Sequence, residues 1–388
     1  MRKWLYGIVA LVVVALAAFL IFAPGIAERS MNKVVPVALK ITPAARQVHL
    51  GLDIADMHAD TLLWKRDLLE RSTRGQVDLP RLQDGNVALQ IFSSVTKTPK
   101  GQNYDSNSAD TDNITTLAIA DLQPIRTWNS LLQRSLWHAT KLDRFAAASN
   151  GALRVIRSPG DLDTLLAERA KGAKITGGML SIEGLQDIEG NLANLDTLYK
   201  AGFRMAGMAH FFDNEVAGSM HGERKGGLTP LGRQVIARME KIGMIVDIAH
   251  SSHETVAEIL KIATRPVVAS HGGVQATCKV NRNLTDDEIR GVAATGGVVG
   301  IGYWDGAVCG TSPAKIADAI AHARNVGGID HVGLGSDFDG AVTTGCDTSK
   351  LAAVTQALMD RGFARGDIAK VMGGNVLRVI RAGIAPRP

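Results

Sequence analysis

The sequence predicts an α/β fold, a (β/α)8 barrel of the TIM type, because eight apolar runs alternate with stretches of helical periodicity. Polar residues stand where six of these runs end, and residues just past the strand ends line the active-site face of such a barrel. In the alternative, an open doubly wound sheet, only the point where the strand order reverses forms a crevice, so six converging side chains favour the closed barrel. The runs are Leu52–Met57, Val87–Phe92, Gly177–Ile182, Phe203–Ala209, Met244–Ala249, Pro266–Ser270, Gly297–Tyr303 and Val332–Ser336.

Helical periodicity fills the intervals between these runs. Between the fifth and the sixth run, Val256, Ile259 and Leu260 recur at the spacing of one helix face. Most connections are short, but we expect the long interval between the second and third runs, residues 94–174, to form a helical insertion over one rim. Its first part, Thr96–Asn113, is polar. The expected helices are Thr115–Ala148, Ser158–Ala170, Leu192–Ala201, Thr229–Ile242, Asp286–Ala294, Pro313–Val326, Lys350–Arg361 and Asn375–Ala382.

Residues 1–27 have the features of a signal anchor, a transmembrane helix that is not cleaved. The run from Trp4 to Ala23 has no charged residue, and about 20 residues span a bilayer as a helix. Two basic residues precede this run, so the positive-inside rule places the rest of the chain outside the cytoplasm, which is the periplasm if the source is a Gram-negative bacterium. A cleaved signal peptide is the alternative, because Gly25–Ala27 is small enough for a peptidase, but the apolar run is longer than a usual signal core.

The charge distribution separates the N-terminal segment from the rest of the chain. The first 50 residues hold six Lys/Arg and one acid, so the remainder carries 37 residues of each sign and the net charge of +5 belongs to the N-terminal segment. This distribution argues against nucleic acid as a partner. We expect residues 28–50 to be a linker and residues 51–388 to form the barrel domain.

Five residues at the ends of the predicted strands form a candidate metal site. The three cysteines of the chain lack zinc-finger spacing, so a metal would be held by histidines and carboxylates. His58 and Asp60 stand two residues apart, which places both side chains on one side of an extended segment. Glu183, His250 and His271 add three more ligands of the types that bind zinc.

Five ligands favour two metal ions rather than one. Glu183 is the candidate bridge, because a carboxylate has two oxygens and this residue lies between the two histidine groups in the sequence. Each ion would then have three protein ligands and one open position, which is the catalytic pattern of zinc ligation. We therefore predict two Zn²⁺ ions per chain at the C-terminal face of the barrel, bridged by Glu183.

Each of these residues also has an ordinary interpretation. An isolated His-x-Asp occurs by chance more often than not, a Glu-Gly pair after an apolar run is typical of a turn, and Asp337 could cap a helix. The metal site is favoured because all five candidate ligands follow a predicted strand and none lies in the middle of a helix. The remaining histidines lack this placement, and we expect surface or packing roles for most of them: His49, His138, His221, His253, His322 and His331.

Long, ordered motifs between about residues 51 and 382 resemble the membrane dipeptidase (renal dipeptidase) family of zinc peptidases. This resemblance implies a (β/α)8 barrel with a binuclear zinc centre that hydrolyses dipeptides, often with a D-residue at the C-terminal position, and some members of that family open β-lactams. The motifs that carry it are HAD after the first run, SIEG, GLTPLGRQVIARMEKIGMIVDIAHSS, PVVASH, NRNLTDDEIRGVAATGGVVGI, HVGLGSDFDG and GGNVLRVI.

The resemblance also assigns roles to individual residues. It implies that His58, Asp60 and Glu183 hold one zinc ion, and that Glu183, His250 and His271 hold the other. It further implies that His210 contacts the scissile carbonyl, that Arg282 binds the substrate carboxylate, and that Asp337 acts in proton transfer.

Two segments depart from the family pattern. The family usually has DGHND at the first strand, where this chain has DMHAD and keeps both ligands. After His210 the common run of Asn, Thr and Pro before a Trp is replaced by FFDNEVAGSMHG. That loop borders the substrate in the family, so the second departure bears on specificity.

Two other functions are compatible with parts of this pattern. A related amidohydrolase-like barrel would act on lactams, esters or cyclic amides, but such barrels often carry His-x-His and a carboxylated lysine instead of His-x-Asp and a glutamate. A catalytically inactive binding protein on the membrane would lack a ligand or Asp337, and none is missing. The expected partners are a dipeptide substrate and the membrane, and a homodimer is one assembly compatible with the sequence.

Overall fold

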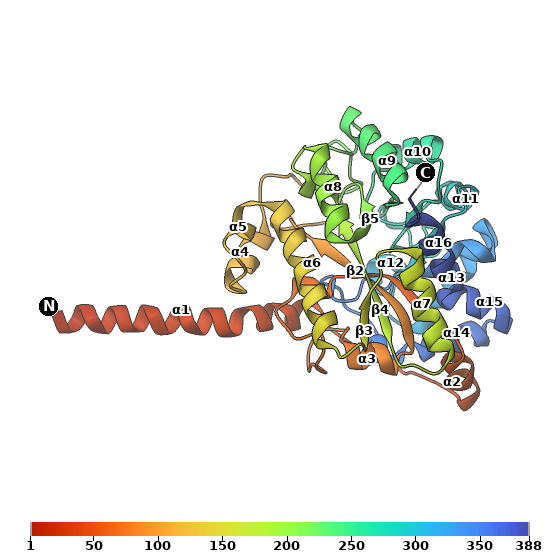
Figure 1. Cartoon of the computed structure of the whole chain (residues 1–388), viewed down its shortest axis with the longest axis horizontal. Coiled ribbons are helices and arrows are strands. Elements are labelled where there is room, and N and C mark those ends of the chain that lie inside the picture. The colour runs from red at the N-terminus through yellow and green to blue at the C-terminus, as the bar shows by residue number, and fades with distance from the viewer. Residues whose placement is uncertain (1, 387–388) are drawn as a thin grey trace.

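The computed structural model describes residues 2–386, and a closed barrel of eight parallel strands lies at its centre (Figure 1). The strand order is β2-β1-β9-β8-β7-β6-β5-β4, and β2 also pairs with β4, which closes the sheet. The predicted barrel is therefore confirmed and the open sheet is excluded. The barrel strands are β1 Ile54–Ala59, β2 Val87–Val95, β4 Thr176–Glu183, β5 Phe203–Gly207, β6 Ile245–Asp247, β7 Val268–Ala269, β8 Val298–Ile301 and β9 Val332–Leu334.

The strands are buried on both faces, as expected for parallel strands with helices outside and a filled interior. The closing pair runs in register from Leu89–Gly177 to Val95–Glu183. A ninth strand that the sequence did not predict, β3 (Leu153–Val155), pairs with the first residues of β4. Gly177 fits this crowded junction because a Cβ there would lie 2.7 Å from the Leu165 side chain.

Helices surround the barrel in the intervals where they were predicted. Side-chain caps define several of their starts, including capping boxes in which Ser158 pairs with Asp161 and Thr285 pairs with Glu288. The longer helices of this ring are α7 Pro159–Ala170, α8 Leu192–Ala201, α9 Pro230–Ile242, α10 His253–Ile262, α11 Asp286–Ala294, α13 Pro313–Gly327, α14 Ala352–Asp360 and α16 Asn375–Gly383. Shorter elements are α3 Leu79–Asp84, α12 Asp305–Val308, α15 Arg365–Ala369, η1 Thr61–Leu63, η2 Leu185–Ile188, η3 Ile329–His331, η4 Thr348–Lys350 and η5 Lys370–Gly374.

The insertion between β2 and β4 is helical, as expected, but Thr115–Ala148 is not one continuous helix. It is divided into α4 (Asn113–Ala120), α5 (Arg126–Asn129) and α6 (Leu131–Ala148). Leu122 adopts a left-handed conformation (φ 55°), and Pro124 follows, so the helical hydrogen-bond pattern ends here. Figure 1 shows α4 and α5 on the side of the barrel from which α1 projects.

The N-terminal helix α1 (Arg2–Met31) extends away from the barrel and carries an exposed apolar surface (Figure 1). Within residues 2–386 it is the one helix that is long and apolar enough to cross a membrane, a property that signal sequences share. Its last turn is fixed to the domain, because Glu28 is buried and pairs with Arg66 and Arg74, each at 2.5 Å.

The segment 28–50 contains more structure than its composition suggested. It holds the end of α1 and a second helix, α2 (Pro43–Leu50), which begins where the Thr42 hydroxyl accepts from the Ala45 N–H. Gln356 of α14 accepts hydrogen bonds from both the amide and the hydroxyl of Thr42. The division of the chain at residues 28–50 stays a prediction.

A buried polar network attaches α6 to the barrel. The Ser135 hydroxyl donates to Asp187 at 2.6 Å, and Ser94 of β2 lies within hydrogen-bonding distance of both Ser135 (3.0 Å) and His138 (2.8 Å). Burial lowers the pKa of His138 to about 3 and raises the pKa of Asp187 to about 7. Between these two pKa values, both the imidazole of His138 and the carboxyl of Asp187 are neutral.

The raised pKa of Asp187 predicts a pH-dependent contribution to stability. An unfolded Asp has a pKa of about 3.9, so between about pH 4 and pH 7 the folded state holds more protons, and this residue lowers stability as pH rises. Asp187→Asn keeps an acceptor for Ser135 and carries no charge. We expect its Tm, relative to that of the wild type, to be higher at pH 8 than at pH 5. The exposed control Asp105→Asn should show no such pH dependence, and an equal difference at both pH values for Asp187→Asn would contradict the assignment.

Candidate metal centre

The five predicted ligands meet at the C-terminal end of the barrel, with Glu183 in the middle. All are at most 5% exposed. The Oε1 atom of Glu183 lies 3.0 Å from Nε2 of His250 and 3.2 Å from Nε2 of His271. Its Oε2 atom lies 3.6 Å from Nε2 of His58, which is in turn 3.4 Å from Oδ1 of Asp60. The two oxygens of Glu183 thus face different groups, as a bridging carboxylate requires.

Several polar atoms in this cluster are buried and lack a hydrogen-bond partner in the described part of the chain. They include Nε2 of His58, Oδ1 of Asp60 and Oε2 of Glu183. In addition, the Nε2 atoms of His250 and His271 face each other at 3.0 Å. A buried polar atom without a partner costs about 1–3 kcal/mol, and a cation would offset this cost. The donor set, imidazole nitrogen and carboxylate oxygen, fits zinc.

One of the three closest sets of ligand atoms combines residues from the two groups that the family resemblance implies, and each of the others adds His210 or Asp337 to residues of one group. The division of the five residues between two ions therefore stays a prediction, although Glu183 belongs to two of the three sets. The sets whose ligand atoms all lie within 4.8 Å of one another are His58–Glu183–His271, Glu183–His210–His250 and His58–Asp60–Asp337.

The protonation states favour metal binding at two of the histidines and oppose it at a third. Burial acts to lower the pKa of His58, but the carboxylate of Glu183 outweighs it and holds that pKa well above its ordinary value, so a metal ion would have to displace a proton there. Burial lowers the pKa of both His250 and His271 well below the ordinary value, so these imidazoles are neutral, as metal ligands must be. Burial acts to raise the pKa of Glu183, but the imidazoles of His210 and His58 outweigh it and hold that pKa well below the usual range. The centre therefore contains an ionised carboxylate surrounded by nitrogen ligands.

Two buried aspartates that sequence reasoning missed hold the strand ends in place. Asp56 of β1 accepts hydrogen bonds from the amide of His58 (3.0 Å) and the amide of Ser336 (3.1 Å). Asp247 of β6 accepts from the amide of Ser270 at 2.8 Å. In the sequence, each of these aspartates lies inside an apolar run, two or three residues before a predicted ligand, and that position could have revealed them. Such partners orient the residues that bind the metal.

Unusual backbone conformations turn the chain at the strand ends. His250 (φ 63°) and Asp337 (φ 61°) are both left-handed, a conformation that is uncommon for non-glycine residues. Gly184, directly after the central glutamate, has a φ of 87°, and a Cβ there would lie 2.9 Å from the amide nitrogen of His210. The Glu-Gly pair thus forms a turn at a predicted ligand position.

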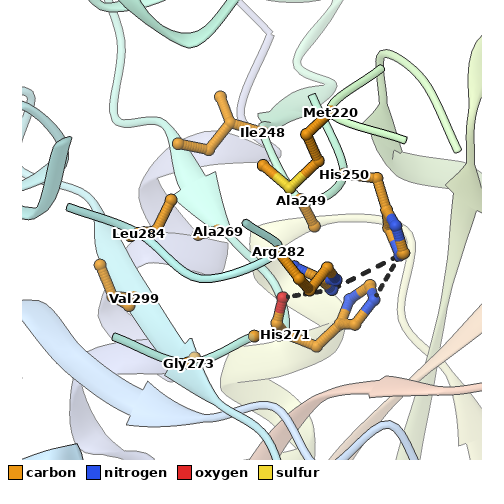
Figure 2. A pocket seen from close by; sticks show the side chains of 12 residues that line it. Met220, Ile248, Ala249, His250, Ala269, His271, Gly273, Arg282, Leu284 and Val299 are labelled. Atoms are coloured by element: carbon orange, nitrogen blue, oxygen red, sulfur yellow. Dashed lines mark hydrogen bonds between the residues drawn. The ribbon is translucent and has the colours of Figure 1, made fainter. Parts of the chain in front are cut away.

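The three residues expected to act on substrate lie beside the metal cluster. His210 follows β5, and its Nε2 atom is 3.4 Å from Oε1 of Glu183. Asp337 follows β9, and its Oδ1 atom is 3.8 Å from Nε2 of His58. Arg282 is buried, and Figure 2 shows its guanidinium beside both His250 and His271.

Arg282 is held by the carbonyl of His271 and the ring of His250 rather than by an acid. Its Nη2 atom donates to the His271 carbonyl at 2.9 Å, and the ion pairs among residues 2–386 do not include it (Figure 2). The disulfide Cys278–Cys309 ties the preceding loop to the segment after α12. The third cysteine, Cys346, is free and buried.

A cavity of about 740 Å³ extends from the metal cluster. The polar segment Thr96–Asn113, which the sequence did not explain, contributes Gly101–Tyr104 to its wall. The Tyr104 hydroxyl accepts from the Trp304 indole at 2.8 Å, and the Tyr104 ring stacks with the buried ring of His221. His221 therefore has the packing role that was expected for it. The cavity wall includes these carboxylate, imidazole and guanidinium side chains: Asp60, Glu183, His210, His250, Arg282 and Asp337.

Comparison with known proteins identifies one family. The sequence pattern of the family described as "Membrane dipeptidase (Peptidase family M19)" matches residues 43–385. A dipeptidase of Aspergillus oryzae, aclJ, is 32% identical over 359 residues, which cover 86% of this chain and 79% of the relative. A dipeptidase of Claviceps purpurea, tcpJ, is 30% identical over 79% of this chain and 69% of the relative.

Solved structures share the fold at lower identity. The probable dipeptidase PvdM of Pseudomonas aeruginosa superposes with a TM-score of 0.73 at 21% identity, over 88% of this chain and 98% of the other. A metallopeptidase of Rhodobacter sphaeroides, solved with a phosphinate mimic of the dipeptide L-Ala-D-Ala, superposes with a TM-score of 0.70 at 21% identity, over 86% of this chain and 99% of the other.

The central position of Glu183 predicts that its loss reduces the metal content. We expect Glu183→Gln, purified from zinc-replete medium, to retain less metal per chain than the wild type, because the amide removes the charge that faces both groups of ligands. Elemental analysis measures this, with the exposed Glu215→Gln as the control for a loss of negative charge. Equal metal content in the two variants would show that Glu183 is not a shared ligand.

Proposed function

This chain belongs to the membrane dipeptidase family and is a metallo-dipeptidase, and we propose that it hydrolyses dipeptides with two Zn²⁺ ions bridged by Glu183. The observation that carries the proposal is the set of unpartnered buried ligand atoms around Glu183, at one end of a cavity large enough for a small peptide. His58, Asp60 and Glu183 would hold one ion, and Glu183, His250 and His271 the other. When bound, the ions would supply a water of near-neutral pKa and polarise the peptide carbonyl.

The residues beside the ligands would position the substrate and move its protons. His210 can donate a hydrogen bond to the carbonyl oxygen as negative charge develops on it. Asp337 can accept a proton from the attacking water and return it to the nitrogen of the leaving amine. The oxygen of water then forms the new carboxylate, and the carbon–nitrogen bond of the peptide breaks.

Arg282 would restrict the enzyme to short peptides. Its guanidinium is buried beside the metal ligands without an acidic partner among the described residues, and its planar fork matches a free carboxylate. A dipeptide's carboxylate lies a few bonds from the scissile carbonyl, so the carboxylate anchor and the metal centre can be engaged together. A longer peptide would place its terminal carboxylate too far away.

We extend the proposal to dipeptides with a D-residue at the C-terminal position, because the Rhodobacter sphaeroides relative was solved with a mimic of L-Ala-D-Ala. The test is a panel of dipeptides in both stereochemical series, assayed after chelation and after zinc is restored. We expect L-Ala-D-Ala and L-Ala-L-Ala to be cleaved only after zinc is restored. No cleavage of any member, with zinc bound, would contradict the proposed function.

Replacing the carboxylate anchor should impair hydrolysis selectively. Arg282→Met should fold and bind metal, but lose roughly tenfold to a hundredfold in kcat/KM on free dipeptides, as a hydrogen bond to a charged group contributes about 1.5–3 kcal/mol. Activity on C-terminally amidated dipeptides, already low, should hardly change. Equal losses on free and amidated substrates would mean that Arg282 supports the fold or the metals instead.

We also propose that α1 anchors the enzyme in a membrane with the barrel on the extracytoplasmic side. The apolar run behind Arg2 and Lys3 supports this orientation. Protease added to intact spheroplasts should then digest the barrel domain. Protection until the cells are lysed would show the reverse orientation or a cytoplasmic location.

A further inference from the structure

The substrate cavity continues beyond the metal centre into an apolar space between α1 and α4. On the α1 side, the lining residues Phe19, Ala23, Ala27 and Met31 recur every four positions, so they share one face of the helix. The opposite wall comes from the insertion and includes Ile114, Leu117 and Ala120 of α4. The same cavity therefore has a polar end, lined by predicted metal ligands and Arg282, and an apolar end, lined by α1 and α4.

The apolar end is held at a fixed position relative to the metal centre. The Asn32 side chain, directly after α1, accepts a hydrogen bond from the amide of Ala341 at 2.8 Å, and Ala341 also lines the cavity. Arg66 pairs with Glu28 of α1 and also with Asp339, two residues from Asp337. These contacts connect the end of α1 to the loop that carries a proposed catalytic residue.

The side chains deeper in this part of the cavity are also apolar. Leu63, Trp64, Val95 and Ile114 form a separate buried hydrophobic cluster, and Leu117 packs against it. All five also line the cavity. A substrate group that enters this space would meet hydrocarbon on several sides, so an apolar group would gain free energy there and a charged group would lose it.

The α1 wall lies outside the part of the chain that the family pattern matches. The family pattern matches residues 43–385, and every α1 residue that lines the cavity precedes residue 43. The catalytic groups proposed above all lie inside the matched region. Any contribution of α1 to substrate selection is therefore made by residues that the family pattern does not match.

We propose that α1 is a wall of the substrate-binding site and that the space between α1 and α4 is a subsite for a large apolar side chain of the dipeptide. The proposal rests on the proposed dipeptidase function and deepens it by naming a substrate class. Preferred substrates are dipeptides with a residue such as leucine. The helix that would anchor the protein also helps to select what it cleaves.

The test uses the full chain in lipid nanodiscs, with intact mass confirming that α1 is present. Ala27→Phe fills the subsite, and Ile26→Phe makes the neighbouring change at a residue that is 66% exposed and does not line the cavity. The readout is kcat/KM for Leu-Ala and Ala-Leu, each divided by kcat/KM for Ala-Ala. We expect the wild type to prefer at least one leucine dipeptide, Ala27→Phe to lower that ratio roughly tenfold, and Ile26→Phe to leave it unchanged.

A second variant distinguishes a blocked subsite from a folding defect in Ala27→Phe. Met31→Ala removes part of the wall at a residue that is 48% exposed, and we expect it to lower the same ratio by severalfold. Unchanged ratios in both variants, with Ala-Ala still cleaved, would overturn the subsite and leave the dipeptidase function standing. A mature protein cleaved after Ala27 would overturn it as well. No cleavage of any dipeptide by the wild type would overturn the dipeptidase function and the subsite together.

Discussion

The placement of one ionised carboxylate, Glu183, among buried imidazoles is the constraint on which the site depends. A buried carboxylate is costly unless it is paired, and here its partners are nitrogen atoms 3.0–3.6 Å away on three other strand ends. The arrangement requires the ends of β1, β4, β6 and β7 to converge, and a closed parallel barrel provides that convergence. Asp56 and Asp247 then fix the ends of the strands by accepting backbone hydrogen bonds.

Sequence reasoning recovered the elements that local pattern determines. Each barrel strand is a short apolar run, and each ligand stands directly after such a run, so both could be read along the chain. The five ligands, His210, Arg282 and Asp337 lie together at the barrel mouth as expected, while their roles stay predictions. The helix that begins after Thr285 was also predicted, and the structure shows a capping box at its start.

The features that were missed depend on contacts between distant segments. The short strand β3 exists only by pairing with β4, and three residues carry too little pattern to reveal it. The sequence of the segment Thr96–Asn113 is typical of a polar loop. In the structure, the Tyr104 hydroxyl accepts a hydrogen bond from Trp304, 200 residues away, and Tyr104 forms part of the cavity wall. Two contacts of residues 28–50 also have no local signal: Gln356 of α14 accepts from Thr42, and Asn32 accepts from Ala341.

The metal centre proposed for this chain has two zinc ions that share Glu183 at the barrel mouth. Crystals of the zinc-loaded protein, measured at the zinc absorption edge, test it most directly through the anomalous difference density. The account predicts two peaks, one beside His58 and Asp60 and one beside His250 and His271, each in contact with an oxygen of Glu183. A single peak, or two peaks of which one lies away from Glu183, would contradict it.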